Sequence, residues 1–333
     1  MNNNPVSKTV KRELSKFLNK SFFFSQSDNN YAEEIILAAK AYTYVETAEG
    51  KSDSLHLKIK QCDWENLLGV YREIIKPYLR RLNIKRGIIA LDITPEPFYG
   101  KTTGFYTIGC KGENGYTHEF QFLVLSLIDE KKEEKIPLAC IPVHYGFDCA
   151  NAIKDLLAYA NKLFTIRFVL LDREFYSAEN INALSGFRYL MLVPKLSREI
   201  KQLSEVVKYG YMDYKLRDHK GEEASTRIVL VRDKSDKFTW SFATNMVCED
   251  YHAYVKFYKR RWRIETNFRV DDEAKIKSKS VFSVIRYFYF LMSLLLRAIW
   301  LVFRREIPFK RFLIQTHKCM LLERFGIYQM TTC

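Results

Sequence analysis

Hydrophobic and polar positions follow two different periods along this chain of 333 residues. Up to about residue 85, apolar residues recur at intervals of three and four, as in EEIILAAKAYTYVE (33–46) and WENLLGVYREIIKPYLRRL (64–82). The polar, turn-forming TAEGKSDS separates these two runs. The spacing predicts a helical domain over residues 1–85. Such a domain could contact DNA, although no helix-turn-helix pattern identifies a recognition helix.

From residue 86 the pattern changes to short runs of β-branched and aromatic residues, separated by turn residues and by two helical segments. RGIIALDIT (86–94) predicts a buried strand, and the glycine-containing turn within FYTIGCKGENGYTHEFQFLVLSLID (105–129) predicts a hairpin after it. The order then becomes helix, strand, helix, strand, in DCANAIKDLLAYANKL (148–163), IRFVLLD (166–172), SAENINALSG (177–186) and FRYLMLVPK (187–195). This order predicts an α/β domain with a mixed sheet flanked by helices.

The second half of the chain contains a β-rich segment followed by long helices. TRIVLVRD (226–233) and FTWSFATN (238–245) predict strands of an insertion over about 200–250, and a helical region starts near Asp250. The apolar run Tyr287 to Phe303 contains Arg297, so we interpret it as a buried helix and expect no membrane span. We expect the α/β domain to cover residues 86–310 and a C-terminal tail to follow over 311–333.

The charge balance points to a polyanionic partner. Lysine and arginine number 53 against 39 acidic residues, which gives a formal charge of +14 spread along the chain. Nucleic acid fits this charge best, because phosphate neutralisation releases counterions and gives affinity for any sequence. The seven cysteines show no zinc-type spacing, and the first residues lack a secretory signal. We therefore expect a cytoplasmic, nucleoid-associated protein.

Two carboxylates lie where buried strands end. Asp92 and Asp172 each follow a strongly apolar run, where a carboxylate is costly unless it meets a cation or hydrogen-bond donors. The ordinary interpretation of an aspartate at such a position is a turn former or a helix cap. Strand ends are also where ligand sites assemble in α/β sheets. Arg173 and Glu174 adjoin Asp172, and the sequence leaves their role open.

A third carboxylate lies in the basic helical segment YKRRWRIETNFR (258–269). At 3.6 residues per turn, Tyr258, Arg261, Glu265 and Arg269 fall on one face. If Glu265 reaches the two aspartates, the three carboxylates would repel one another unless hard divalent cations lie between them. Two Mg²⁺ ions, for which Mn²⁺ could substitute, would then support in-line phosphoryl transfer. Nine basic and four acidic residues occupy 256–279, so this region could also bind substrate phosphates.

Over about residues 86–300 the chain resembles the IS4-like superfamily of insertion-sequence transposases, close to its ISH3 branch. The motifs are ALDIT at Asp92, LLDREFYS at Asp172, the strand ending in FATN, and Tyr258-x-x-Arg261-x-x-x-Glu265. The resemblance implies an RNase H-like catalytic core with a β-rich insertion, acting as a DNA transposase that cleaves transposon ends and transfers strands. It also implies that Asp92, Asp172 and Glu265 are catalytic metal ligands.

The same resemblance implies that Tyr258 and Arg261 contact the DNA end, within a homodimer bound to terminal-repeat and target duplexes. The family has a lysine seven residues after the glutamate, where this chain has Asp272. Lys275 could take over its DNA contact, and Arg269 is a further candidate contact. Two alternatives stay open: an RNase H-like nuclease without strand transfer, and an inactive DNA-binding protein derived from a transposase.

Overall fold

The computed structural model describes most of the chain, and all structural statements below refer to that part. The described residues are 5–22, 31–47, 52–101, 104–113, 115–129, 134–194, 198–218, 221–235, 237–272, 275–303 and 306–326, without the side chains of residues 5, 52, 113, 129, 134, 198 and 262–272.

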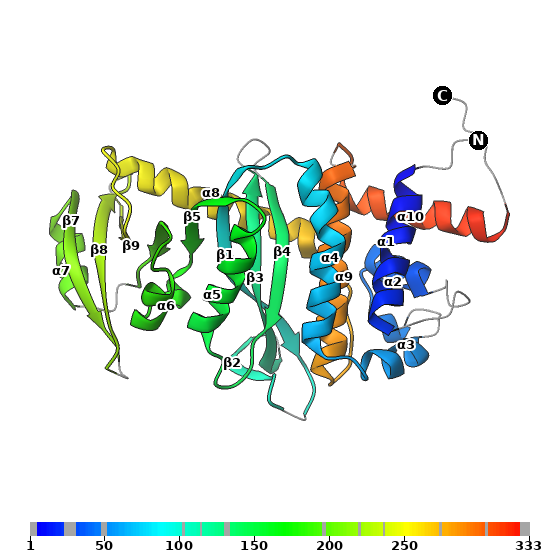
Figure 1. Cartoon of the computed structure of the whole chain (residues 1–333). Helices are drawn as coiled ribbons and strands as arrows, with labels where there is room; N and C mark the ends of the chain where they lie inside the picture. Colours follow the sequence, from blue (N-terminus) through cyan, green and yellow to red (C-terminus); the bar gives the residue numbers. More distant parts are fainter. Residues whose placement is uncertain are drawn as a thin grey trace.

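A mixed sheet of nine strands forms the centre of the fold (Figure 1), with neighbours in the order β2-β3-β1-β5-β6-β9-β8-β7 and β4 paired to β3. β1 runs parallel to β5 and β5 parallel to β6, whereas β3 and β4 are antiparallel to their neighbours. This order agrees with the predicted strand, hairpin and β-α-β pattern. The strands are β1 (Arg86–Phe98), β2 (Ile108–Glu113), β3 (Tyr116–Asp129), β4 (Glu134–Pro142), β5 (Thr165–Leu171), β6 (Tyr189–Leu192), β7 (Tyr209–Arg217), β8 (Glu223–Arg232) and β9 (Thr239–Thr244).

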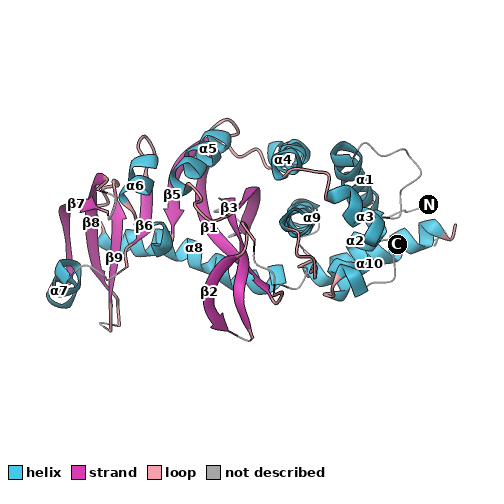
Figure 2. Cartoon of the chain, turned by 90° about the horizontal axis from the view of Figure 1, so that it is seen from below, coloured by secondary structure: helices cyan, strands magenta, loops and turns pink. Residues whose placement is uncertain are grey.

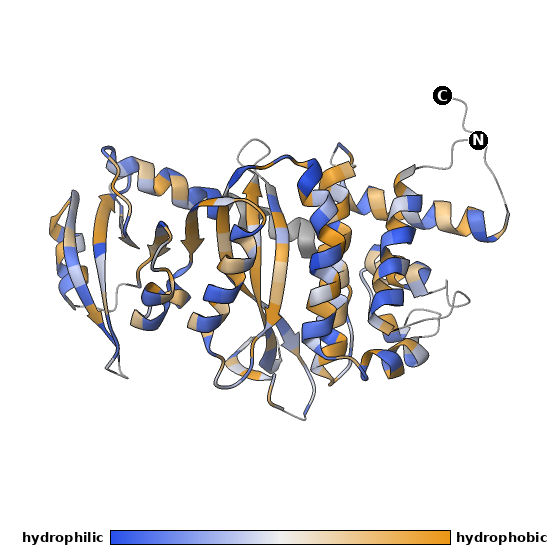
Figure 3. Ribbon diagram, in the orientation of Figure 1, coloured by the Kyte–Doolittle hydropathy of each residue, from blue (hydrophilic) through white to orange (hydrophobic). Residues whose placement is uncertain are grey.

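Alternation along β1 divides the core between the two faces of the sheet. Ile89 and Leu91 face a large cluster that includes α5 (Cys149–Asn161) and α6 (Ala178–Ala183), whereas Ile88 and Ala90 face α8 (Tyr251–Asp272). Figure 2 shows α5 and α8 on opposite sides of the strands. In Figure 3, the central strands are mostly hydrophobic and the outer faces of the helices are more hydrophilic.

The N-terminal helices form as predicted and pack against the C-terminal helices beside the sheet (Figure 1). They are α1 (Pro5–Phe22), α2 (Tyr31–Ala41), the short η1 (Val45–Thr47), α3 (Ser52–Ile59) and α4 (Trp64–Arg81). The apolar α9 (Ser283–Phe303) packs against α4 and β4, and α10 (Phe309–Arg324) packs against α1 and α2. The C-terminal tail predicted from residue 311 is therefore wrong up to Arg324, because Phe312 and Leu313 bury their side chains.

α9 is the one helix of the described residues long and apolar enough to cross a membrane. Within the protein, 83% of its apolar window is buried. The interpretation of this segment as a buried core helix is confirmed, because Tyr287, Phe288 and Leu291 fill the space between α4 and the sheet.

The β-rich insertion continues the central sheet. β9 pairs with β6, β8 with β9 and β7 with β8, all antiparallel, after the short α7 (Arg198–Val206). β7 alternates between exposed and half-buried residues along its whole length, as expected of an edge strand. The insertion therefore extends the sheet beyond β6.

Candidate active site

The register of β1 and β5 brings the two predicted aspartates together. Ala90 pairs with Leu170 in the parallel ladder, so Asp92 and Asp172 each come two residues later and lie side by side where β5 ends. Both continue the alternation of Ala90 and Leu170, whose side chains face α8. The prediction that the two aspartates converge is confirmed. The prediction that β1 ends at Asp92 is wrong, because β1 continues to Phe98 in its antiparallel pairing with β3, and only Asp172 follows the end of its strand.

Asp172 also has the ordinary role expected of an aspartate at a strand end. Its Oδ1 accepts a hydrogen bond of 2.7 Å from the Arg173 amide and caps the short helix η2 (Arg173–Phe175). The same oxygen accepts a 3.0 Å hydrogen bond from the Tyr258 hydroxyl. The capping interaction fixes the carboxylate and leaves Oδ2 directed to a second partner.

That partner is Arg261, which connects both aspartates. Its Nη2 lies 3.2 Å from Asp172 Oδ2, and its Nη1 lies 3.7 Å from Asp92 Oδ1. Its Nε donates to the Tyr258 hydroxyl at 3.2 Å, and the guanidinium is only 2% exposed. One cation therefore compensates two carboxylates that would otherwise repel each other.

The packing of α8 holds Arg261 in place. Tyr254, Val255 and Tyr258 are buried against the sheet, and each such side chain contributes about 1.5–3 kcal/mol of burial free energy. Phe257 contacts Phe168 with ring centroids 5.2 Å apart. Phe257 is only partly buried, so Tyr254, Val255 and Tyr258 provide most of this packing.

Lys135 is a second cation at the site and was not identified from the sequence. It lies on β4, its side chain is 7% exposed, and its Nζ is 3.5 Å from Asp92 Oδ2. Burial lowers the pKa of Lys135, and the negative charge of Asp92 opposes that change. A lysine at the start of the apolar run KIPLACIP was the only signal that the sequence offered.

Glu174 is a third carboxylate beside the aspartates. The residue is largely exposed, but its Oε1 accepts a 3.3 Å hydrogen bond from the Ile93 amide. Partial desolvation of the carboxylate, together with the negative charge of Asp92, raises the pKa of Glu174 to about 7. The sequence left the role of Glu174 open. The structure shows that its carboxylate lies near enough to Asp92 for the charge of that aspartate to act on it.

The remaining predicted residues lie on or after the distal part of α8. Glu265 and Arg269 belong to α8, but their side chains lie outside the described residues. α8 ends at Asp272, so Lys275 is not on the helix. Burial raises the pKa of Glu96, and the positive charge of nearby Lys275 opposes that change. The predicted DNA contacts of Tyr258, Arg261, Arg269 and Lys275 stay predictions. In this conformation Tyr258 and Arg261 are buried against the aspartates.

The oxygen donors at the site suit a hard divalent cation. Asp92 and Asp172 present oxygens that already bind a cationic group, and their side chains are 13% and 27% exposed, so a ligand can reach them. Among the described side chains, no three His, Cys, Asp or Glu residues are close enough to hold a metal ion. A third protein ligand would thus have to be a side chain that the structure does not describe. The predicted ligand Glu265 is one of these.

Comparison with known proteins shows which family and fold this arrangement resembles. Residues 148–287 match a family model described as the transposase DDE domain, a segment that includes Asp172 and Glu265 and begins after Asp92. No curated protein sequence matches the chain. The piggyBac transposase, solved by cryo-EM in a synaptic complex with hairpin DNA, has a similar fold at a TM-score of 0.55. The alignment has 10% identity and covers 99% of this chain and 80% of that one. The mixed sheet flanked by helices is therefore an RNase H-like core.

Proposed function

We infer that this chain is a DDE transposase, an enzyme of DNA transposition, that cleaves and joins DNA where Asp92 and Asp172 meet, with Glu265 as the third carboxylate. One observation carries the assignment: two aspartates from adjacent parallel strands converge on a single buried guanidinium. A pair of carboxylates at this position is expensive without a cation. The arrangement therefore supports a site where divalent metal ions can take the place of the Arg261 guanidinium between the aspartates.

DDE transposases use divalent metal ions, and we propose Mg²⁺ here, with Mn²⁺ as a substitute. Bound between the carboxylates, such ions would activate a water or a 3′-hydroxyl and stabilise the leaving oxygen. The chain's own residues orient the ligands. Tyr258 and the Arg173 amide hold Asp172 Oδ1, and Lys135 holds Asp92 from the side of β4.

The substrate that we propose is a duplex carrying the terminal repeats of an insertion sequence of the IS4-like type. The net charge of +14 supports this substrate because it favours binding to a polyanion. We also propose that two copies of the chain act together in the DNA complex. For Tyr258 and Arg261 to contact DNA, their side chains have to leave the aspartates, so we propose that they first act as positioning residues.

A strand-transfer assay tests this function against both alternatives. The purified chain is mixed with a labelled duplex that ends in the repeats flanking its own gene, and with a supercoiled target plasmid in Mg²⁺. Cleavage followed by joined product supports a transposase. Cleavage without joined product indicates a nuclease, and a mobility shift without cleavage indicates an inactive DNA-binding protein; either result overturns the proposal.

A further inference from the structure

A cleft of about 530 Å³ lies between the N-terminal helices and the end of β1. Its volume is within the range of sites that bind small molecules or parts of larger ones. The basic and aromatic residues that line it, which we call the lysine–tyrosine cleft, are Tyr42, Tyr44, Tyr99, Lys275, Lys277 and Lys279. This combination of cations and aromatic rings is typical of surfaces that bind single-stranded nucleic acid.

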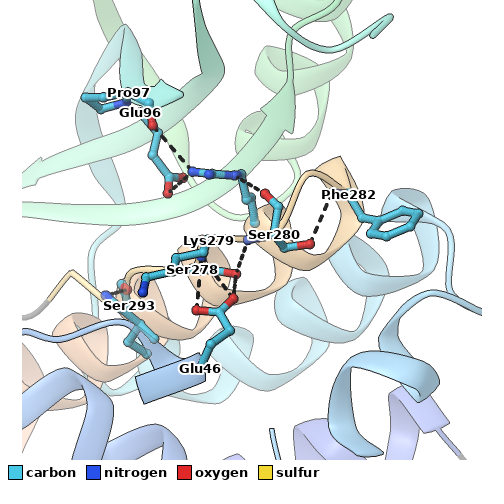
Figure 4. A network of polar contacts seen from close by, with 10 residues as sticks. Glu46, Glu96, Pro97, Ser278, Lys279, Ser280, Phe282 and Ser293 are labelled. Atoms are coloured by element: carbon cyan, nitrogen blue, oxygen red, sulfur yellow. Dashed lines mark hydrogen bonds and ion pairs between the residues drawn. The ribbon is translucent and has the colours of Figure 1, made fainter. Parts of the chain in front are cut away.

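The backbone that carries these lysines is fixed to the N-terminal domain. The Glu46 carboxylate accepts hydrogen bonds from the Lys279 amide at 2.9 and 3.0 Å and from the Ser278 hydroxyl at 2.5 Å (Figure 4). The Val45 amide donates to the Lys277 carbonyl at 2.9 Å. The lysine side chains thus extend from a segment that does not need to order itself when a ligand binds.

The carboxylate in the described lining of the cleft is already neutralised. Glu96 is 7% exposed and forms a 3.0 Å ion pair with Arg286, whose Nε donates to the Ser280 carbonyl at 2.7 Å (Figure 4). Glu96 and Arg286 cancel each other's charge. Lys275, Lys277 and Lys279 then outweigh the nearby Glu46 carboxylate, and the net positive charge makes the cleft attractive to phosphate.

Tyr42 occupies a backbone position that would suit glycine better. It follows α2 directly and has a φ of 51°, in the left-handed region that a tyrosine adopts only with strain. Its ring lies 3.6 Å from the Lys277 Nζ and remains 42% exposed. Strain of this kind points to a functional reason for the aromatic ring. Tyr99, on the other side of the cleft, is 60% exposed.

The cleft is close to the site of chemistry. Glu96 lies four residues beyond Asp92 on β1, which corresponds to about 13 Å along the strand and to the same face of the sheet. A DNA strand that leaves the aspartates in this direction reaches the cleft first. In an intact duplex the base faces are stacked on one another, whereas an unpaired nucleotide presents its base face to an aromatic ring.

We propose that the lysine–tyrosine cleft binds a nucleotide of single-stranded DNA next to the cleavage site. Its base stacks on Tyr99, its phosphate contacts Lys277 and Lys279, and Tyr42 positions Lys277. The inference rests on the proposed function, because it places the strand by reference to Asp92. The cleft should therefore prefer unpaired DNA to duplex DNA, whereas a surface that is only basic would not.

The test measures binding of an oligothymidylate that contains one 2-aminopurine, in a chelator, so that no cleavage is needed. Fluorescence anisotropy gives affinity at several salt concentrations, and quenching of the 2-aminopurine reports stacking. Tyr99→Ala should weaken binding about fivefold to 150-fold and abolish quenching, whereas Tyr99→Phe should preserve both. Lys277→Ala and Lys279→Ala should each lower the salt slope by about 0.7, and the matched change Lys154→Ala on α5 should not.

Tyr42→Gly is a variant that cannot fail through backbone strain, because glycine accepts the left-handed conformation. Tyr42→Gly should weaken binding of the oligonucleotide about fivefold or more, while the melting temperature of the protein stays equal or rises. The proposal is overturned if Tyr99→Ala binds and quenches like the wild type, if the lysine variants keep the full salt slope, or if Tyr99→Ala weakens binding of a duplex of equal length as much as binding of the single strand. Cleavage by the wild type in Mg²⁺ is scored separately, so these results leave the proposed function standing.

Discussion

Replacement of Arg261 by methionine removes the cation between the two aspartates and keeps most of the side-chain volume. The guanidinium is 2% exposed and lies 3.2 Å from Asp172 and 3.7 Å from Asp92. Removal of one partner from a buried pair typically costs about 3–5 kcal/mol. The two carboxylates are 27% and 13% exposed, and Lys135 stays near Asp92. Because water screens part of the repulsion, we expect a loss of about 2–4 kcal/mol.

The assay is urea unfolding of the wild type and of Arg261→Met, with and without Mn²⁺, with the exposed Lys256→Ala on the same helix as a control. The divalent ion should stabilise Arg261→Met more than the wild type, because the arginine no longer competes for the carboxylates. The lysine control should differ from the wild type by less than about 0.5 kcal/mol. The reasoning is refuted if Arg261→Met loses less than about 1 kcal/mol, or if Mn²⁺ stabilises both proteins equally.

Three further outcomes follow from the contacts around the site. The pKa of Glu174 is raised from 4.5 to about 7, so the folded protein binds more protons than the unfolded chain between these values, and its stability falls as pH rises through this window. Glu174→Gln should flatten that decline in unfolding curves, and an unchanged decline would contradict the assigned cause. Glu96→Ala or Arg286→Ala should each cost about 3–5 kcal/mol, with a double variant less destabilised than the sum, whereas additive losses would argue against the pair. For terminal-repeat duplex binding, Lys275→Ala should lower the slope of log affinity against log salt concentration by about 0.9, which corresponds to one phosphate contact. An unchanged slope would contradict the predicted DNA contact of Lys275.

Local hydrophobic patterns predicted most of the elements, because the spacing of apolar residues in a helix or strand reflects which face is buried. The strands that carry Asp92 and precede Asp172, the hairpin and the helix carrying Arg261 follow from such patterns, although β1 continues through the predicted turn Pro95–Pro97 to Phe98. β4 did not stand out, because its run IPLACIP contains two prolines and is apolar throughout. The edge strand β7 and the helix α10 were missed because they carry many polar residues and bury only part of their surface.

The site was only partly predictable for a different reason. The approach of Asp92 to Asp172 depends on one strand register, which the β-α-β order specifies. The contacts of Lys135 with Asp92 and of Arg286 with Glu96 join distant segments, the latter 190 residues apart, so no local pattern encodes them. The sequence also could not reveal that Arg261 is buried between the aspartates. A helical pattern shows which residues share a face of the helix, but it does not show what that face contacts.

The most direct test of the central claim is a metal-specificity switch at the three carboxylates. Asp92→Cys, Asp172→Cys and Glu265→Cys each replace a hard oxygen ligand by a softer thiolate, which accepts Mn²⁺ more readily than Mg²⁺. Cleavage of the terminal-repeat duplex should be lost in Mg²⁺ and partly regained in Mn²⁺, while the exposed Asp213→Cys on β7 should cleave normally in both. Cleavage near the wild-type rate in Mg²⁺ by any of the three variants would contradict the account for that residue.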